Sequence, residues 1–136
     1  MANKPLIYRI YGDLTNAVAS FSPVHLGRPK TTDSPKSHFI VVTLPTEIKD
    51  ITAGNTDFSL KTYGYYDIYV KAKTDSTMNV NAQTTLTAKV EALFPIKGEV
   101  MVASKPTLRF MGYDGYGFHV TRVIFDIRTL ININNL

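Results

Sequence analysis

Three histidines are the residues best suited to bind a metal ion or to move protons near neutral pH: His25, His38 and His119. A metal site would need at least two of them to converge with a carboxylate, and none lies in the close pairs that are typical of zinc ligands. The chain contains no cysteine, so thiolate ligands, disulfides and a cysteine nucleophile are excluded. The sequence therefore predicts no metal site.

The glycine-rich stretch GYDGYG, residues 112–117, superficially resembles a phosphate-binding loop. No lysine–serine pair follows it, and the next segment is strand-like, so no helix N-terminus would face a phosphate. A tight turn is the better interpretation. The serines and threonines of the chain do not form a nucleophile elbow either.

Carboxylates are scattered over different predicted elements: Asp13, Asp67, Asp114 and Asp126. Asp126 lies at strand spacing between Arg122 and Arg128, which predicts a ladder of charges on one face of a strand. Paired carboxylates for acid–base catalysis are not indicated. We therefore expect a protein without enzymatic activity and without a cofactor.

Tyrosines are more informative, because Tyr63, Tyr65, Tyr66 and Tyr69 fall within one short segment and Tyr113 and Tyr116 in a late turn. Aromatic side chains on the polar face of a sheet or at turn tips are favoured contact residues. The alternative is that some of them cover the edge of the core. The last six residues, ININNL, are apolar at 131, 133 and 136, and they carry too little charge for a tail surrounded by solvent.

The net charge is +4, and the densest basic segment is HLGRPKTTDSPKSH. Such a loop could lie near nucleic-acid phosphates, although a solvated loop is the plainer interpretation. Together with the tyrosines, these segments give the predicted interface residues: Arg28, Lys30, Lys36, Tyr63, Tyr65, Tyr69, Tyr113, Tyr116, Ile131 and Ile133.

The elements that would position these residues follow from hydrophobic periodicity. Helical spacing of apolar residues predicts helices near 4–20 and 80–94, with Leu93 and Phe94 buried. Segments 38–44 and 58–72 read as adjacent antiparallel strands, and Gly64 suggests a bulge or a break in the second. Two short strands, EVMVA and TLRFMGY, precede a long strand at 118–130 that is apolar on much of both faces and therefore central.

With 136 residues, 44% of them hydrophobic, the chain fits a single domain, 1–136, with a long loop at 22–37 and a short tail at 131–136. The predicted class is α+β, an antiparallel or mixed sheet with two main helices packed on one face. The start, MANKPLIYRIYGDL, is neither a signal peptide nor a membrane span, and no run reaches about 18 apolar residues. We expect a soluble protein made in a cytoplasm, with no membrane partner.

The order of these elements, with IVVTLP followed by YDIYVKA as its strongest piece, resembles the tail-terminator and tail-completion proteins of tailed bacteriophages and their relatives in the neck. The resemblance covers nearly the whole chain. It implies a structural, non-enzymatic subunit of a homo-oligomeric ring, six- or twelve-fold, in the virion. Such a ring would contact neighbouring portal, neck or tail proteins and let genomic DNA pass through its lumen without sequence-specific binding. The subunit would be made in the cytoplasm of the bacterial host.

Two other classes of function remain open at this stage. A small nucleic-acid-binding module would need a contiguous cationic face with aromatic side chains for stacking. A small-ligand or enzyme domain with an α+β fold would need a deep pocket with converging polar groups.

Overall fold

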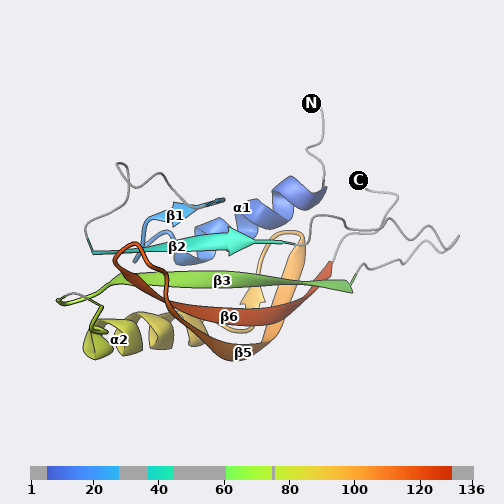
Figure 1. Cartoon of the computed structure of the whole chain (residues 1–136). Coiled ribbons are helices and arrows are strands. Elements are labelled where there is room, and N and C mark those ends of the chain that lie inside the picture. Colours follow the sequence, from blue (N-terminus) through green and yellow to red (C-terminus); the bar gives the residue numbers. More distant parts are fainter. Residues whose placement is uncertain (1–5, 28–36, 45–60, 75, 130–136) are drawn as a thin grey trace, which may run out of the picture.

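A computed structural model of the chain describes residues 6–27, 37–44, 61–74 and 76–129. All of its strands join one six-stranded sheet in the order β1-β2-β3-β6-β5-β4 (Figure 1). β1 and β2 are parallel and every other neighbouring pair is antiparallel, so the predicted α+β class with a mixed sheet is confirmed. The elements are α1 (Leu6–Val18), β1 (Val24–His25), β2 (His38–Thr43), β3 (Lys61–Lys71), α2 (Val80–Glu91), β4 (Ile96–Lys97), β5 (Met101–Tyr113) and β6 (Phe118–Thr129).

Helix α1 buries the apolar stripe that its sequence predicted. Ile10, Leu14 and Val18 have no exposed surface, and they recur at the spacing of four that keeps side chains on one face of a helix. The hydroxyl of Tyr66 on β3 donates a buried hydrogen bond of 2.7 Å to the carbonyl of Leu14. The helix is therefore joined to the sheet by apolar contact and by one directional bond.

Helix α2 begins after an asparagine cap and ends earlier than predicted. The Asn79 side chain accepts a 3.2 Å hydrogen bond from the amide of Ala82. The helix ends at Glu91, and Leu93 and Phe94 follow in a tighter turn whose amides bond to residues three positions back. The two side chains are only partly buried at the rim of the core, so the prediction that they would be buried is wrong.

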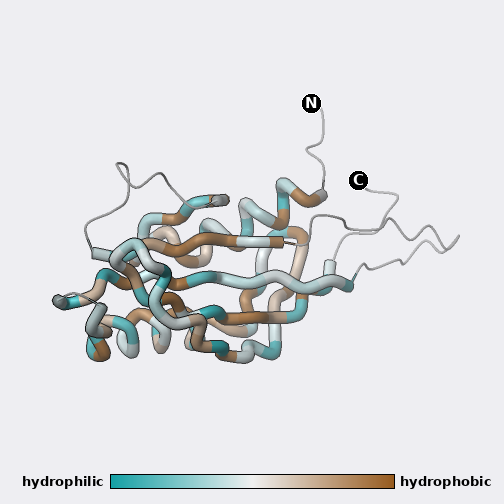
Figure 2. The backbone as a smooth tube through the Cα atoms, in the orientation of Figure 1, coloured by the Kyte–Doolittle hydropathy of each residue, from teal (hydrophilic) through white to brown (hydrophobic). Residues whose placement is uncertain are grey.

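The long strand β6 is central, as predicted, with β3 on one side and β5 on the other. In Figure 2, much of β2 and of β6 has the brown colour of hydrophobic residues. One face contributes Val123, Phe125 and Ile127 to the main core, whereas Phe118 joins a smaller cluster on the other face.

The main core cluster unites side chains from both helices with alternate residues of the strands. The sheet contributes Tyr66, Ile68 and Phe125 among others, and α2 contributes Leu86 and Val90. The sheet curls, most clearly along β5 (Figure 1). The expected packing of both helices on one face of the sheet is not confirmed.

Strand β3 contradicts the expectation of a bulge at Gly64. Its pairing with β6 runs without interruption from Lys61 to Lys71. A β-carbon at Gly64 would lie 2.8 Å from Cδ2 of Leu44, 3.1 Å from Cδ1 of Ile127 and 3.2 Å from the carbonyl oxygen of Thr43. The glycine is therefore required by close packing against β2 and β6, and not by an irregular backbone.

Strand β5 is one long strand where two had been predicted. The register with β6 shifts between Ser104 and Thr107 and again between Phe110 and Gly112, so the strand bends without ending. β4 pairs only with Val102 and Ala103. Within the described ranges, residues 105–113 thus have β6 as a partner on one side and no strand on the other, and all are exposed. We call this segment the β5 edge.

The stretch GYDGYG is the tight turn that the sequence indicated. Gly112, Gly115 and Gly117 all have φ between 83° and 97°, a region that favours glycine. The Asp114 carboxylate accepts hydrogen bonds from the amides of Tyr116, at 2.7 Å, and Phe118, at 3.1 Å. Elsewhere, two residues of the segment expected to be a loop, 22–37, form β1 against β2. No helix in the described part of the chain is long and apolar enough to cross a membrane.

Candidate functional site

The tyrosines of β3 lie on the face of the sheet opposite Tyr66 and Ile68. Because side chains alternate along a strand, Tyr63, Tyr65 and Tyr69 all project from this second face. Tyr63 is 51% exposed, and Tyr65 and Tyr69 are partly buried. The three predicted interface tyrosines of β3 therefore share one face, although they differ in their surroundings.

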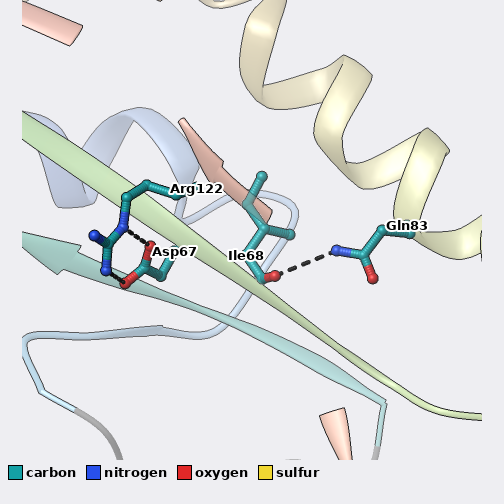
Figure 3. A network of polar contacts seen from close by, with 4 residues as sticks. All are labelled: Asp67, Ile68, Gln83 and Arg122. Carbon is teal, nitrogen blue, oxygen red and sulfur yellow. Dashed lines mark hydrogen bonds and ion pairs between the residues drawn. The ribbon is translucent and has the colours of Figure 1, made fainter. Parts of the chain in front are cut away.

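Asp67 and Arg122 form an ion pair in the middle of this face. The guanidinium donates two hydrogen bonds to the carboxylate, from Nε to Oδ1 at 2.8 Å and from Nη2 to Oδ2 at 3.1 Å. Its carbon atom Cζ lies 3.9 Å from the centre of the Tyr65 ring, a cation–π contact. Hydrogen bonding to Asp67 raises the pKa of Arg122. Figure 3 shows this pair beside β3 and Gln83 reaching β3 from α2.

Arg122, Asp126 and Arg128 share one face of β6, as predicted, but Arg122 forms its ion pair with Asp67 on the neighbouring strand. Only 10% of the Asp67 side chain and 24% of the Arg122 side chain are exposed. The ion pair is therefore largely buried, and the charges of Asp67 and Arg122 cancel each other.

One end of the second face is apolar. Phe39, Val41 and Phe118 are buried there, and Tyr69 stacks on Phe39 with ring centroids 4.5 Å apart and planes 11° from parallel. Tyr69 therefore covers a small core, which is the alternative role that the sequence had left open.

The other end of the second face carries exposed cations in a line across the strands. Lys61 of β3 lies directly opposite Arg128 of β6, Arg128 lies opposite Val102 of β5, and Val102 lies opposite Lys97 of β4. Residues opposite each other in antiparallel strands share a face. We call Lys61, Arg128 and Lys97 the basic row; all three are exposed.

Tyr113 and Tyr116 are separate from the tyrosines of β3. Tyr113 lies opposite His119, and the two rings are 5.3 Å apart. Because His119 also lies opposite Val70 of the main core, Tyr113 belongs to the face of Tyr66 and Ile68. Tyr116, 67% exposed, lies in the turn before β6.

The β5 edge contains exposed apolar residues that sequence reasoning missed. Phe110 is 75% exposed, and Met111 and Leu108 are 43% and 37% exposed. The segment TLRFMGY was read as an ordinary strand, because periodicity does not tell whether a strand has one neighbour or two. The predicted interface residues Arg28, Lys30, Lys36, Ile131 and Ile133 lie outside the described residues.

The histidines lie apart and contact other groups. His119 Nε2 is 2.6 Å from the carbonyl oxygen of Ser76, and His38 Nε2 is 3.4 Å from that of Phe21. His25 on β1 packs its ring edge-on against Phe39. In the parts of the chain that the structure describes, no three His, Asp or Glu side chains gather in a group that could hold a metal ion.

A pocket of about 270 Å³ lies between α2, the start of β2 and Phe21. Its polar lining includes Asn79 and His38, of which the first caps α2 and the second contacts the main chain of Phe21. These two groups therefore already have structural roles, and the rest of the polar lining consists of Ser37, Thr85 and Lys89.

No family model and no curated protein matches this sequence. Among solved structures, one protein known only by a serial designation superposes with a TM-score of 0.60 at 12% sequence identity. The superposition covers 93% of this chain and 94% of the other. At this identity the likeness concerns the fold alone.

Proposed function

We propose that the chain is a self-associating structural subunit, a ring-forming protein of the neck or tail of a tailed bacteriophage such as a tail terminator or head–tail connector. The observation that carries the proposal of self-association is the β5 edge. Phe110, Met111 and Leu108 are exposed on a strand whose outer side has no described neighbour. Monomeric proteins usually protect such edges with charges, prolines or short strands, because unpaired backbone groups and apolar side chains attract a further strand. The β5 edge carries Lys105, Pro106 and Arg109, but the exposed pair Phe110–Met111 follows them without a charge or a proline.

The two ends of the sheet differ, and this favours a ring over a symmetric dimer. At the end opposite the β5 edge lies β1, followed by Leu26, which is 61% exposed. A contact between two unlike surfaces repeats from subunit to subunit and closes into a ring when the rotation permits. In the proposed ring, the β5 edge of one subunit lies against the β1 end of the next. The assignment to a bacteriophage neck or tail rests on the order of elements in the sequence.

We also propose that α1 and α2 both pack on the face of the sheet that carries Tyr66 and Ile68. The bond from Tyr66 to Leu14 of α1 and the 3.4 Å bond from Gln83 of α2 to the carbonyl of Ile68 support this arrangement. It leaves the second face, with the basic row and Tyr63, uncovered by α1 and α2.

Engineered cysteines test the contact, because the chain has none of its own. The double variant Leu26→Cys/Phe110→Cys should form disulfide-linked ladders under mild oxidation, ending in a closed species. Either single variant should remain monomeric on a non-reducing gel, since a head-to-tail contact does not bring two copies of one position together. Cross-linked dimers of the Phe110→Cys variant alone would show a two-fold contact and would contradict the ring.

Solution mass gives an independent measurement. The wild-type chain, of 15.2 kDa, should show concentration-dependent association in analytical ultracentrifugation, and Phe110→Asp should abolish it. Tyr8→Asp is the matched control, because Tyr8 is 62% exposed on α1 and belongs to neither the β5 edge nor β1. A wild-type protein that stays monomeric in ultracentrifugation and forms no disulfide ladder in the double cysteine variant would refute self-association.

A further inference from the structure

We propose that the second face of the sheet binds a single strand of nucleic acid, with phosphates on the basic row and on Arg109, and with an unpaired base stacked on Tyr63. This inference goes beyond the proposed ring and does not depend on it, because every residue involved belongs to one subunit. The partner is identified by charge and by exposed aromatic surface.

The first support is the distribution of charge. Besides the basic row, the face carries Arg109 directly opposite Arg122. The only carboxylates at the paired positions of β3, β5 and β6 on this part of the face are Asp67, which Arg122 neutralises, and Asp126. Lys61 and Arg128 are direct cross-strand neighbours of like charge, and Lys97 lies in the same row beyond Val102, so the cations repel one another in the free protein and a polyanion relieves that repulsion.

The second support is the spacing along the strands. Arg122 and Arg128 are six residues apart on β6, which at about 3.3 Å per residue separates the basic row from Arg109 by about 20 Å. An extended single strand spans such a distance with a few nucleotides, so its backbone could contact both groups of cations. Nonspecific single-strand sites combine cationic tracks and aromatic stacking in this way.

The third support is the position of Tyr63 between these cations. Tyr63 follows Lys61 by two residues on the same face and is 51% exposed. Tyr65, by contrast, already receives the Arg122 guanidinium on its ring. Tyr63 is therefore the tyrosine with open ring surface, and stacking on it needs a base that is not paired in a duplex.

The test uses fluorescence anisotropy of the full chain with a labelled 20-residue thymidine oligonucleotide and a duplex of equal length. The single strand should bind more tightly, and the logarithm of its association constant should fall with the logarithm of salt concentration, by about 0.7 per phosphate contacted. Lys97→Ala/Arg128→Ala should weaken binding by about ten-fold or more at roughly 50 mM salt and reduce the slope by about 1.4. The control Arg9→Ala/Lys89→Ala removes the same charge from the two helices and should change neither.

Tyr63→Ala should weaken single-strand binding by about five-fold or more while leaving the salt dependence unchanged. Tyr8→Ala is its control, with a tyrosine of similar exposure on α1. Asp126→Asn should tighten binding by about two-fold, because it removes the carboxylate opposite Tyr63.

Three results would overturn the inference. The first is no binding of the single strand at about 50 mM salt, and the second is a loss of affinity in Arg9→Ala/Lys89→Ala equal to that in Lys97→Ala/Arg128→Ala. The third is tighter binding of the duplex together with no effect of Tyr63→Ala. Measuring the Phe110→Asp variant separates this inference from the ring. If that variant is monomeric and still binds the oligonucleotide, the face acts within one subunit. If binding disappears with association while the fold is intact by circular dichroism, the face does not act alone and the inference fails.

Discussion

A substitution at Gly64 gives the most direct test of the packing between β2, β3 and β6. Gly64→Ala would place a methyl group 2.8 Å from Cδ2 of Leu44 and 3.2 Å from the carbonyl oxygen of Thr43. The leucine can change rotamer, but the carbonyl belongs to the backbone of a buried strand, so β2 has to shift. Inserting a methyl group into a packed core costs about 1–3 kcal/mol.

A second effect acts in the opposite direction. Replacing glycine by alanine restricts the unfolded chain and stabilises the folded protein by about 0.4–1 kcal/mol where no strain results. The expected net effect of Gly64→Ala is therefore a loss of about 0.5–2 kcal/mol in the free energy of unfolding. For a domain of this size, that corresponds to a fall in melting temperature of roughly 2–8 °C.

Gly12→Ala is the matched control, because the same chemical change occurs in helix α1 with nothing within 4 Å of the new β-carbon. It should raise the free energy of unfolding by about 0.5–1 kcal/mol. Urea denaturation followed by circular dichroism measures both variants, with similar m-values expected. If Gly64→Ala were as stable as the wild type, glycine would not be required there by close packing, and the account of β3 given above would be wrong.

Three further predictions concern polar contacts of the core. Tyr66→Phe should cost about 1 kcal/mol, because the main-chain carbonyl on α1 loses its buried partner. Burial raises the pKa of Tyr66, so above about pH 10 the folded protein keeps the hydroxyl proton of Tyr66 while the unfolded chain loses it. The free energy of unfolding, measured from urea midpoints, should therefore fall as the pH rises above about 10, and it should fall less steeply in Tyr66→Phe. Arg122→Ala should cost about 1–3 kcal/mol in chemical denaturation, more than Asp67→Asn, because it leaves a mostly buried carboxylate without its guanidinium. Asp13→Asn should lower the free energy of unfolding by about 1 kcal/mol, because the Asp13 carboxylate accepts a 3.0 Å hydrogen bond from the amide of Val100 and so joins α1 to the start of β5. Thermal melts measure this loss, and an unchanged melting temperature would contradict this role.

Features that depend on local periodicity could be predicted from the sequence. Ile10, Leu14 and Val18 repeat every four residues and are buried, and the start of β6 is buried on both faces, as its apolar sequence indicates. The cap of α2 is equally local, because the Asn79 side chain bonds to the amide of Ala82 three residues further on. In each case the determining contacts lie within a few residues along the chain.

Features that depend on distant neighbours could not be predicted. A glycine within a strand is compatible with a bulge and also with close packing of a neighbouring side chain. At Gly64 only the packed structure shows that the second reason applies, because Leu44 lies against it. Arg122 pairs with a carboxylate 55 residues away, although Asp126 was nearer in the sequence. The basic row joins residues of three strands, so no contiguous segment displays it.

The central position of β6 also determines when the sheet can be completed. β6 comes after all other described strands in the chain, yet it is the strand that joins β2 and β3 to β5 and β4. During synthesis, a nascent chain that lacks β6 holds a β2–β3 pair and a β5 segment with no common partner, and their apolar faces remain unpaired. The β3–β6 contact closes a long loop, and such contacts form slowly. The intact sheet is therefore expected to form only once β6 has been made, in a single late step.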